Sequence, residues 1–270
     1  MTTRADRGLY WQRALSLVEG CSPVSPGCAH CWSAAATHMR AQQDNPRIAA
    51  RYAMLTRNSG DFNGIVRFQA DALGLPERTR KPTRWAVWND LFHECMPAER
   101  ISMICEMMER CKEHTFCVLT KRAARLRELF VGREILSPTE RLVVTRIQFN
   151  LGWPRNIWLG VTCEDQRTAD ERIKDLQATP AIVRWLSVEP LLERIDLRGL
   201  AGISWVVVGA ETGPHRRPCD LGSVQSVVEQ CDHAHVPVWV KALEIDGKIT
   251  TDLSRFPAWA QRRELPEGTP

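Results

Sequence analysis

The sequence predicts an α/β protein in which parallel strands form a partial or complete (β/α) barrel. Short apolar runs alternate along the chain with segments whose apolar residues recur at helical spacing. The apolar runs are continuous, which is typical of parallel strands that are covered on both faces. Tight connections between successive strands and helices favour a parallel sheet, either open or curled into a barrel.

In the first half of the chain, three short apolar runs predict strands and two segments predict helices. The strands are expected at residues 14–18, 84–88 and 115–119. The first helix is expected at residues 33–40. A second helix is expected at residues 97–112, because one face of it carries the apolar residues Ile101, Ile104, Cys105 and Met108.

The second half repeats this alternation. A capping box formed by Ser137, Pro138 and Glu140 predicts the start of a helix. Another helix is expected at residues 165–178, with Ala169, Ile173 and Leu176 on one face. The remaining strands are expected at residues 156–162, 181–188, 204–208 and 236–240.

Length and composition limit the class of protein. The chain has 270 residues, of which 44% are hydrophobic and 25% are charged, as is ordinary for a globular protein. We expect one domain over residues 1–250 and a C-terminal tail over residues 251–270. The beginning of the chain has no apolar signal core, and no run approaches the roughly 20 apolar residues that cross a bilayer. We therefore expect a cytoplasmic protein that has no membrane partner.

Three cysteines, Cys21, Cys28 and Cys31, lie close together in the loop after the first expected strand. In a chain of this size without a leader, clustered cysteines indicate metal ligands more often than disulfides. Three thiolates can hold three corners of a four-iron cluster, which leaves the fourth iron open to a small molecule. A structural zinc site that uses His30 or a distant fourth ligand is an alternative, as are a disulfide or unreactive thiols.

Polar residues follow nearly every expected strand. The carboxyl ends of parallel strands meet at one edge of a sheet, which is where such folds bind ligands. Each residue alone could be a helix cap or part of a surface loop. Together they predict a site, formed by Asn89, Asp90, Thr120, Lys121, Thr162, Glu164, Ser187, Glu189, Glu211 and Lys241.

Basic residues occur in three groups, which either bind a nucleic-acid backbone or are ordinary solvated surface. Trp88 could stack on a base, although most of the ten tryptophans are expected in the core. The groups are Arg78, Arg80, Lys81 and Arg84, then Lys121, Arg122, Arg125 and Arg127, and finally Arg216 and Arg217.

Several segments carry a resemblance to a known family. The most specific are GCSPVSPGCAHCW, LGVTCEDQ, LSVEPLL and WVVVGAETGPHRRP. The chain resembles a phage- and prophage-associated family of three-cysteine proteins related to the radical S-adenosylmethionine superfamily, over about residues 10 to 242. The resemblance implies a radical-SAM-like barrel with a 4Fe-4S cluster on Cys21, Cys28 and Cys31. It also implies that S-adenosylmethionine binds across the strand ends.

The resemblance, with the order of the strands, implies contacts to this cofactor. Asn89 and Asp90 are expected to meet its methionine end, and His30 its adenine. Thr162, Glu164 and Ser187 are expected at the ribose and carboxylate. The complete expected set is His30, Trp32, Asn89, Asp90, Thr120, Thr162, Glu164 and Ser187.

Some phage members of that family look like enzymes of thymine hypermodification. One reaction suggested for them moves a glycyl group on the thymine methylene of DNA from nitrogen linkage to carbon linkage. The expected partners are then DNA that contains modified thymine and an electron donor such as flavodoxin or ferredoxin, in the host cytoplasm if a phage encodes the chain. The catalytic candidates are Lys121, Glu189, Glu211 and Lys241, and the substrate-binding candidates are Trp88, Arg122, Arg216 and Arg217.

Two alternatives belong to other classes. One is a radical enzyme that acts on a small molecule or a peptide. The other is a zinc-stabilised nucleic-acid-binding module without catalysis. Iron and acid-labile sulfide content separates the second from an enzyme, and DNA binding that weakens steeply with salt counts against the first.

Overall fold

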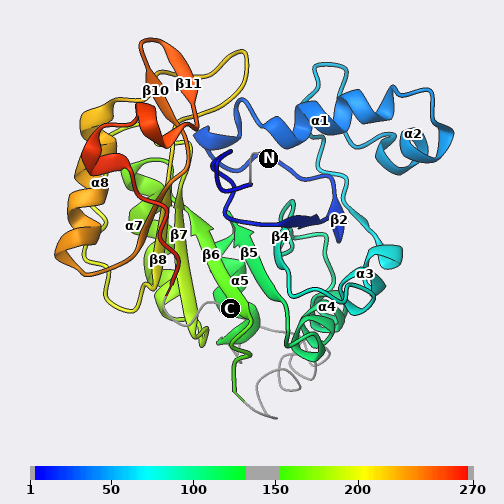
Figure 1. The fold of residues 1–270 in the computed structure, drawn as a ribbon. Coiled ribbons are helices and arrows are strands. Elements are labelled where there is room, and N and C mark those ends of the chain that lie inside the picture. The colour runs from blue at the N-terminus through cyan, green and yellow to red at the C-terminus, as the bar shows by residue number, and fades with distance from the viewer. Residues whose placement is uncertain (1–3, 132–151, 267–270) are drawn as a thin grey trace.

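The computed structural model describes residues 4–131 and 152–266. Within these residues, seven parallel strands form one sheet that curls into a half-barrel (Figure 1). The predicted α/β class with a partial barrel of parallel strands is therefore confirmed. In order across the sheet, the strands are β1 (Arg13–Leu15), β4 (Arg84–Val87), β5 (Thr115–Thr120), β6 (Ile157–Thr162), β7 (Val183–Val188), β8 (Trp205–Val208) and β9 (Val238–Val240).

The prediction was wrong at the first strand. The stretch at residues 14–18 is divided, because β1 ends at Leu15 and β2 (Val18–Glu19) pairs antiparallel with β3 (Arg67–Phe68). The six later strands are present, with ends that differ by one or two residues from those expected. A second antiparallel pair, β10 (Leu243–Ile245) and β11 (Lys248–Thr250), follows β9.

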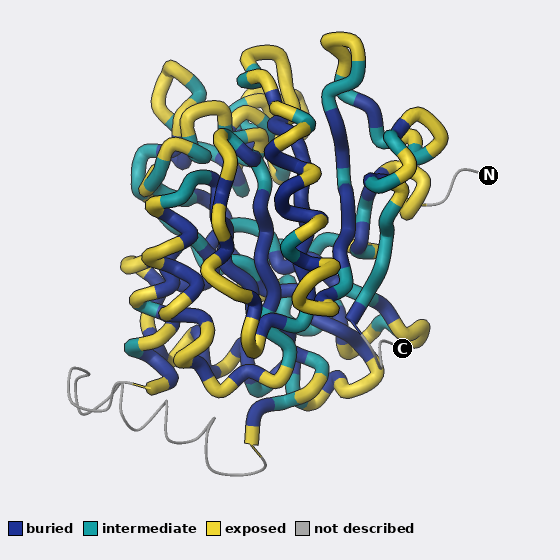
Figure 2. Tube along the Cα trace, turned by 90° about the vertical axis from the view of Figure 1, so that its left-hand side faces the viewer, coloured by how far each residue is buried: buried dark blue, intermediate teal, exposed yellow. Residues whose placement is uncertain are grey.

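The helices that follow β4, β5, β6 and β8 cover the outer face of the sheet, and the sides of these helices that face the strands are buried (Figures 1 and 2). The apolar faces predicted for α4 and α7 are buried as expected. The predicted capping box at Ser137 lies outside the described residues. The α-helices are α1 (Trp32–Ala41), α2 (Pro46–Tyr52), α3 (Gly74–Glu77), α4 (Ala98–Arg110), α5 (Ala123–Phe130), α7 (Gln166–Gln177) and α8 (Leu221–His233).

Aromatic side chains fill the inside of the half-barrel. Trp158, Trp185, Trp205 and Trp239 come from four adjacent strands and belong to one buried cluster. Tyr10 packs edge-on among them, with its ring centroid 5.0 Å from that of Trp205 and 5.5 Å from that of Trp185. This cluster is here called the aromatic floor. Its side chains fill the interior of the curled sheet, so the apolar inner face is buried.

Gly160 makes room for the aromatic floor. It lies in β6 directly opposite Trp185 of β7. A Cβ atom at residue 160 would lie 2.3 Å from an indole carbon of Trp185, which is far inside van der Waals contact.

We therefore expect Gly160→Ala to lower the free energy of unfolding by about 1–3 kcal/mol, because overpacking forces the indole or the strand to move. Urea denaturation measures this change. Trp185→Phe, alone and combined with Gly160→Ala, completes a double-mutant cycle. The alanine should cost less in the Trp185→Phe background, where the smaller ring leaves space, and an equal cost in both backgrounds would contradict the explanation.

The first and last described segments meet beside β9. The Trp239 indole donates to the Gly8 carbonyl at 3.0 Å, and the Arg263 guanidinium donates to the Ala5 carbonyl. Residues 262–264 pair with β9 through backbone hydrogen bonds of 2.9 and 3.1 Å. The described part of the expected C-terminal tail thus covers an edge strand.

Candidate functional site

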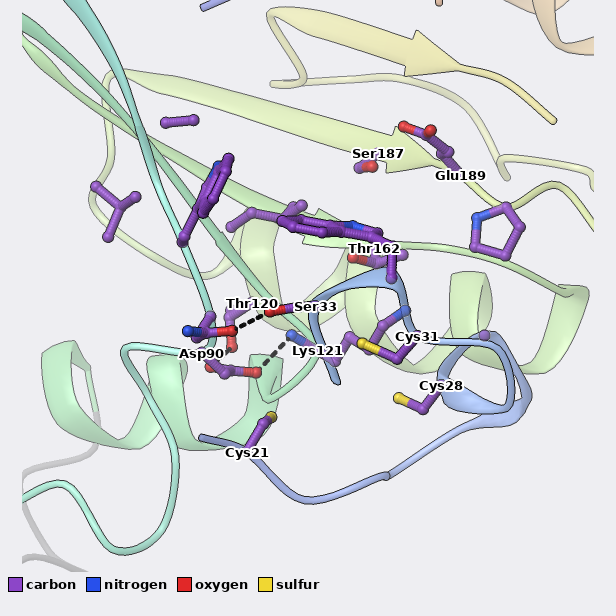
Figure 3. Close-up of a pocket in the computed structure, with 18 of the residues that line it drawn as sticks. Cys21, Cys28, Cys31, Ser33, Asp90, Thr120, Lys121, Thr162, Ser187 and Glu189 are labelled. Atoms are coloured by element: carbon purple, nitrogen blue, oxygen red, sulfur yellow. Dashed lines mark hydrogen bonds between the residues drawn. The ribbon is translucent and has the colours of Figure 1, made fainter. Parts of the chain in front are cut away.

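A cavity of about 250 Å³ lies at the carboxyl ends of the strands, bounded by the loop that carries Cys21, Cys28 and Cys31. This loop, residues 20–31, is here called the cysteine loop. Figure 3 shows the three cysteines on one side of the cavity, with Ser187 and Glu189 opposite. The predicted site residues that line it are Cys21, Cys28, His30, Cys31, Trp32, Trp88, Asn89, Asp90, Thr120, Lys121, Arg122, Thr162, Ser187, Glu189, Glu211 and Lys241.

The three loop thiols are half-buried, and two of them lie beside groups that favour a thiolate. Cys31 is the N-cap of α1, where the backbone N–H groups of Ser33 and Ala34 in the first turn act to lower the pKa of its thiol. Arg122 Nη1 donates to Cys21 Sγ at 3.7 Å. Burial nevertheless raises the pKa of Cys21 to about 12, and it also raises the pKa of Cys31. Metal binding at these sulfurs would therefore displace protons.

The chemistry of these donors fits an iron–sulfur cluster. Among the described residues, no three His, Cys, Asp or Glu side chains converge on one point as the ligands of a single ion do. A four-iron cluster is held differently, because each thiolate binds a different corner. Cys21, Cys28 and Cys31 line one side of a shared cavity, and thiolates are the ligands that iron–sulfur clusters use.

Glu164 lies beneath the middle of the cysteine loop and is completely buried. Ser25 of the loop donates to its carboxylate, as do Lys121 Nζ at 3.2 Å and Arg172 Nη1 at 2.8 Å. Burial alone would raise the pKa of Glu164, but Lys121 and Arg172 bring it below its usual value. The structure does not bring this predicted cofactor contact to the cavity, where it would touch a ligand. Instead, it anchors the loop.

Glu211 and Arg217 fix the far end of the same loop. Arg217 binds the Glu211 carboxylate with Nη2 at 2.5 Å and Nε at 2.9 Å, and its Nη1 donates to the Pro26 carbonyl at 3.1 Å. His30 Nδ1 lies 3.2 Å from the same carboxylate. Burial opposes ionisation, but hydrogen bonds from Arg217 and His30 lower the pKa of Glu211 to about 2. Glu211, a catalytic candidate, and Arg217, a substrate-binding candidate, are thus bound to each other.

Asp90 and Asn89 are engaged within the protein as well. The Asp90 carboxylate accepts from the Thr120 hydroxyl at 2.5 Å, from the Lys121 backbone at 3.0 Å and from Arg122 at 2.9 Å. Asn89 has a left-handed backbone with φ of 59°, and its side chain joins Ser33 of α1 to the Val18 carbonyl. Both residues position the elements around the cavity, where Figure 3 shows Asp90 beside Thr120 and Lys121.

The opposite wall of the cavity offers polar groups to a ligand. Thr162 and Ser187 are direct neighbours across β6 and β7. Lys241 Nζ binds both oxygens of Glu189 at 2.7 and 2.9 Å, and it lies 5.5 Å from the centre of the Trp11 ring. This wall therefore combines two hydroxyls with one ion pair.

Comparison with protein families gave one match, which covers residues 9–265. The matching family is described as "Protein of unknown function (DUF5131)". The chain belongs to this family. The matched range of this DUF5131 chain contains the cysteine loop and every strand of the half-barrel. Comparisons with curated proteins and with solved structures gave no match.

The remaining differences concern residues that the sequence did not place correctly. Arg216 does not line the cavity, because it donates to the Gly247 carbonyl at 2.7 Å beside β11. Tyr10 and Trp11 line the cavity, although nothing in their sequence neighbourhood indicated this. Ser33 also lines it, and its position two residues after the third loop cysteine was a signal that could have identified it.

None of the helices in the described parts of the chain combines the length and the apolar character that crossing a bilayer requires.

Proposed function

We propose that the chain is a radical S-adenosylmethionine enzyme that holds a 4Fe-4S cluster on Cys21, Cys28 and Cys31. One observation carries the proposal. Three half-buried thiols on one loop line a cavity at the carboxyl ends of a half-barrel of parallel strands. When bound, such a cluster supplies the electron that cleaves S-adenosylmethionine into methionine and a 5′-deoxyadenosyl radical.

The cavity walls have groups suited to this cofactor. The hydroxyls of Thr162 and Ser187 would bind its polar groups, and Trp32 and Trp88 would pack against its apolar parts. These two tryptophans touch edge to face, with ring centroids 4.9 Å apart. Tyr10 of the aromatic floor lines the cavity, and this apolar side of the cavity would help to exclude water from a reactive intermediate. A reduced flavodoxin or ferredoxin in the cytoplasm is the proposed electron donor.

For the substrate, we propose a glycyl-modified thymine in DNA. The glycyl group would pass from nitrogen linkage to carbon linkage, so that a C–N bond breaks, a C–C bond forms and the composition is unchanged. Lys241 and Glu189 suit this group, because an ammonium and a carboxylate can bind the carboxylate and the amine of a glycyl unit. A base in duplex DNA would have to flip out to enter the cavity.

Label transfer tests this proposal. Anaerobically reduced protein with S-adenosylmethionine is given DNA whose glycyl-thymine carries deuterium at the glycyl α-carbon. We expect deuterium in the 5′-deoxyadenosine and a new nucleoside that is isomeric apart from label exchange, both measured by mass spectrometry. Formation of 5′-deoxyadenosine without label from DNA would contradict the DNA substrate.

A small-molecule or peptide substrate is the second candidate, and the cavity volume of about 250 Å³ favours it. Label transfer from a free amino acid, peptide or nucleotide, but not from DNA, would support it. A zinc-stabilised module is the third possibility. Protein that binds one zinc, takes up no iron and does not cleave S-adenosylmethionine would be such a module.

A further inference from the structure

Arg122 contacts the cysteine loop from beneath, and its role differs from the substrate binding that the sequence predicts. Its side chain is only 4% exposed, and it lies just after the end of β5. One nitrogen, Nη1, lies 3.7 Å from Cys21 Sγ and 2.9 Å from an Asp90 oxygen. A single buried guanidinium thus joins a loop sulfur to a carboxylate of the sheet edge.

The other nitrogens of Arg122 hold it in this place. Nε binds both oxygens of Glu94 at 2.8 and 2.9 Å. Nη2 donates to the carbonyl of Ser22 at 3.2 Å and to its hydroxyl at 2.7 Å. A planar guanidinium that is held on every side keeps a fixed direction, which a lysine ammonium cannot reproduce. Arg122 is therefore built to present one N–H group to the Cys21 sulfur.

We infer that Arg122 is a positioning residue that raises the reduction potential of the cluster through its hydrogen bond to Cys21, an inference that rests on the proposed function. The potential of an iron–sulfur cluster depends on its net charge and on hydrogen bonds to its sulfurs. Reduction adds one negative charge. A buried cationic donor at a ligand sulfur therefore stabilises the reduced state more than the oxidised state.

The charges around Cys21 make this effect specific to Arg122. Asp90 and Glu94 both bind the guanidinium, so removal of the cation leaves these two carboxylates without it. Lys121 is the neighbouring cation, and its Nζ is directed to Glu164 instead. The buried His93 bonds to the Ser22 hydroxyl at 2.9 Å, and its pKa is lowered by burial and by Arg122.

The test compares reduction potentials of reconstituted protein, measured by potentiometric titration with electron paramagnetic resonance. Arg122→Gln should make the reduction potential of the cluster more negative by at least about 59 mV. At a fixed potential, this shift lowers the ratio of reduced to oxidised protein by a factor of about ten. Arg122→Lys keeps the positive charge but loses the planar set of N–H donors. Its reduction potential should therefore shift less than that of Arg122→Gln. Arg125→Gln is the matched control, because Arg125 follows in α5 and, within the part of the chain that the structure describes, its hydrogen bond goes to the Met96 carbonyl.

The outcomes separate this inference from the proposed function. A wild-type protein that takes up no iron and sulfide would overturn both. A loaded Arg122→Gln protein with the wild-type potential would overturn the inference alone. If the Gln variant does not fold, the Lys variant decides, since an unchanged potential there contradicts a role for the directed N–H group. A shift of the same size in Arg125→Gln would also overturn the inference.

Discussion

Cys28→Ala is expected to abolish the cluster and, with it, cleavage of S-adenosylmethionine. Wild-type protein reconstituted without oxygen should be brown and hold about four irons per chain. The variant should hold almost none, because two thiolates cannot fix three corners. Its fold should survive, since Cys28 is half-buried and its sulfur contacts the Ser25 hydroxyl only at 3.9 Å. Iron and acid-labile sulfide assays measure the loss, and thermal unfolding of the metal-free proteins measures the fold.

Cys95→Ala provides the matched control, because Cys95 is an exposed cysteine outside the cysteine loop. It should keep both the iron content and the formation of 5′-deoxyadenosine. Two results would contradict the assignment. One is a full cluster in Cys28→Ala, and the other is a wild-type protein that binds one zinc tightly and excludes iron.

Glu164→Ala is expected to reduce both stability and cluster retention. The carboxylate is completely buried and compensates Arg172, whose side chain is only 7% exposed. Breaking a buried ion pair from one side costs about 3–5 kcal/mol, because the remaining charge stays buried without a partner. The anchor for Ser25 is lost at the same time, so the cysteine loop gains freedom. Urea denaturation of the metal-free protein and its iron content after reconstitution measure the two effects.

Glu171→Ala is the control for Glu164→Ala. Glu171 also binds an arginine, Arg167, but both side chains are more than half exposed. Exposed pairs of this kind contribute little, so the unfolding curve and the iron content should remain as in the wild type. Equal stability in the two variants would show that the loop does not depend on Glu164.

Sequence patterns predicted which residues meet at the cavity because that depends on local rules. Each strand is recognised from its own apolar run, and the carboxyl ends of parallel strands meet at one edge. Thr162, Ser187 and Glu189 therefore lie together at the cavity, as expected. The same reasoning placed the three cysteines beside them.

Local rules could not predict the roles of Glu164 and Arg217, because the residues that they contact lie far along the chain. Glu164 meets Ser25 across 139 residues, and Arg217 meets Pro26 across 191 residues. A polar residue after a strand looks the same in sequence whether it faces a ligand or anchors a loop. Tyr10 gave even less signal, since it enters the half-barrel from outside the regular strands.

The meeting of the two ends beside β9 has a consequence for how the chain folds. The contact between Gly8 and Trp239 spans 231 residues, and the one between Ala5 and Arg263 spans 258 residues. Contacts of such long range form late, because the entropy of closing a long loop must be overcome first. A chain leaving the ribosome therefore holds an unpaired β9 edge and an open tryptophan cluster until residues 262–264 emerge. During that interval, it exposes the surfaces that lead to aggregation or that chaperones bind.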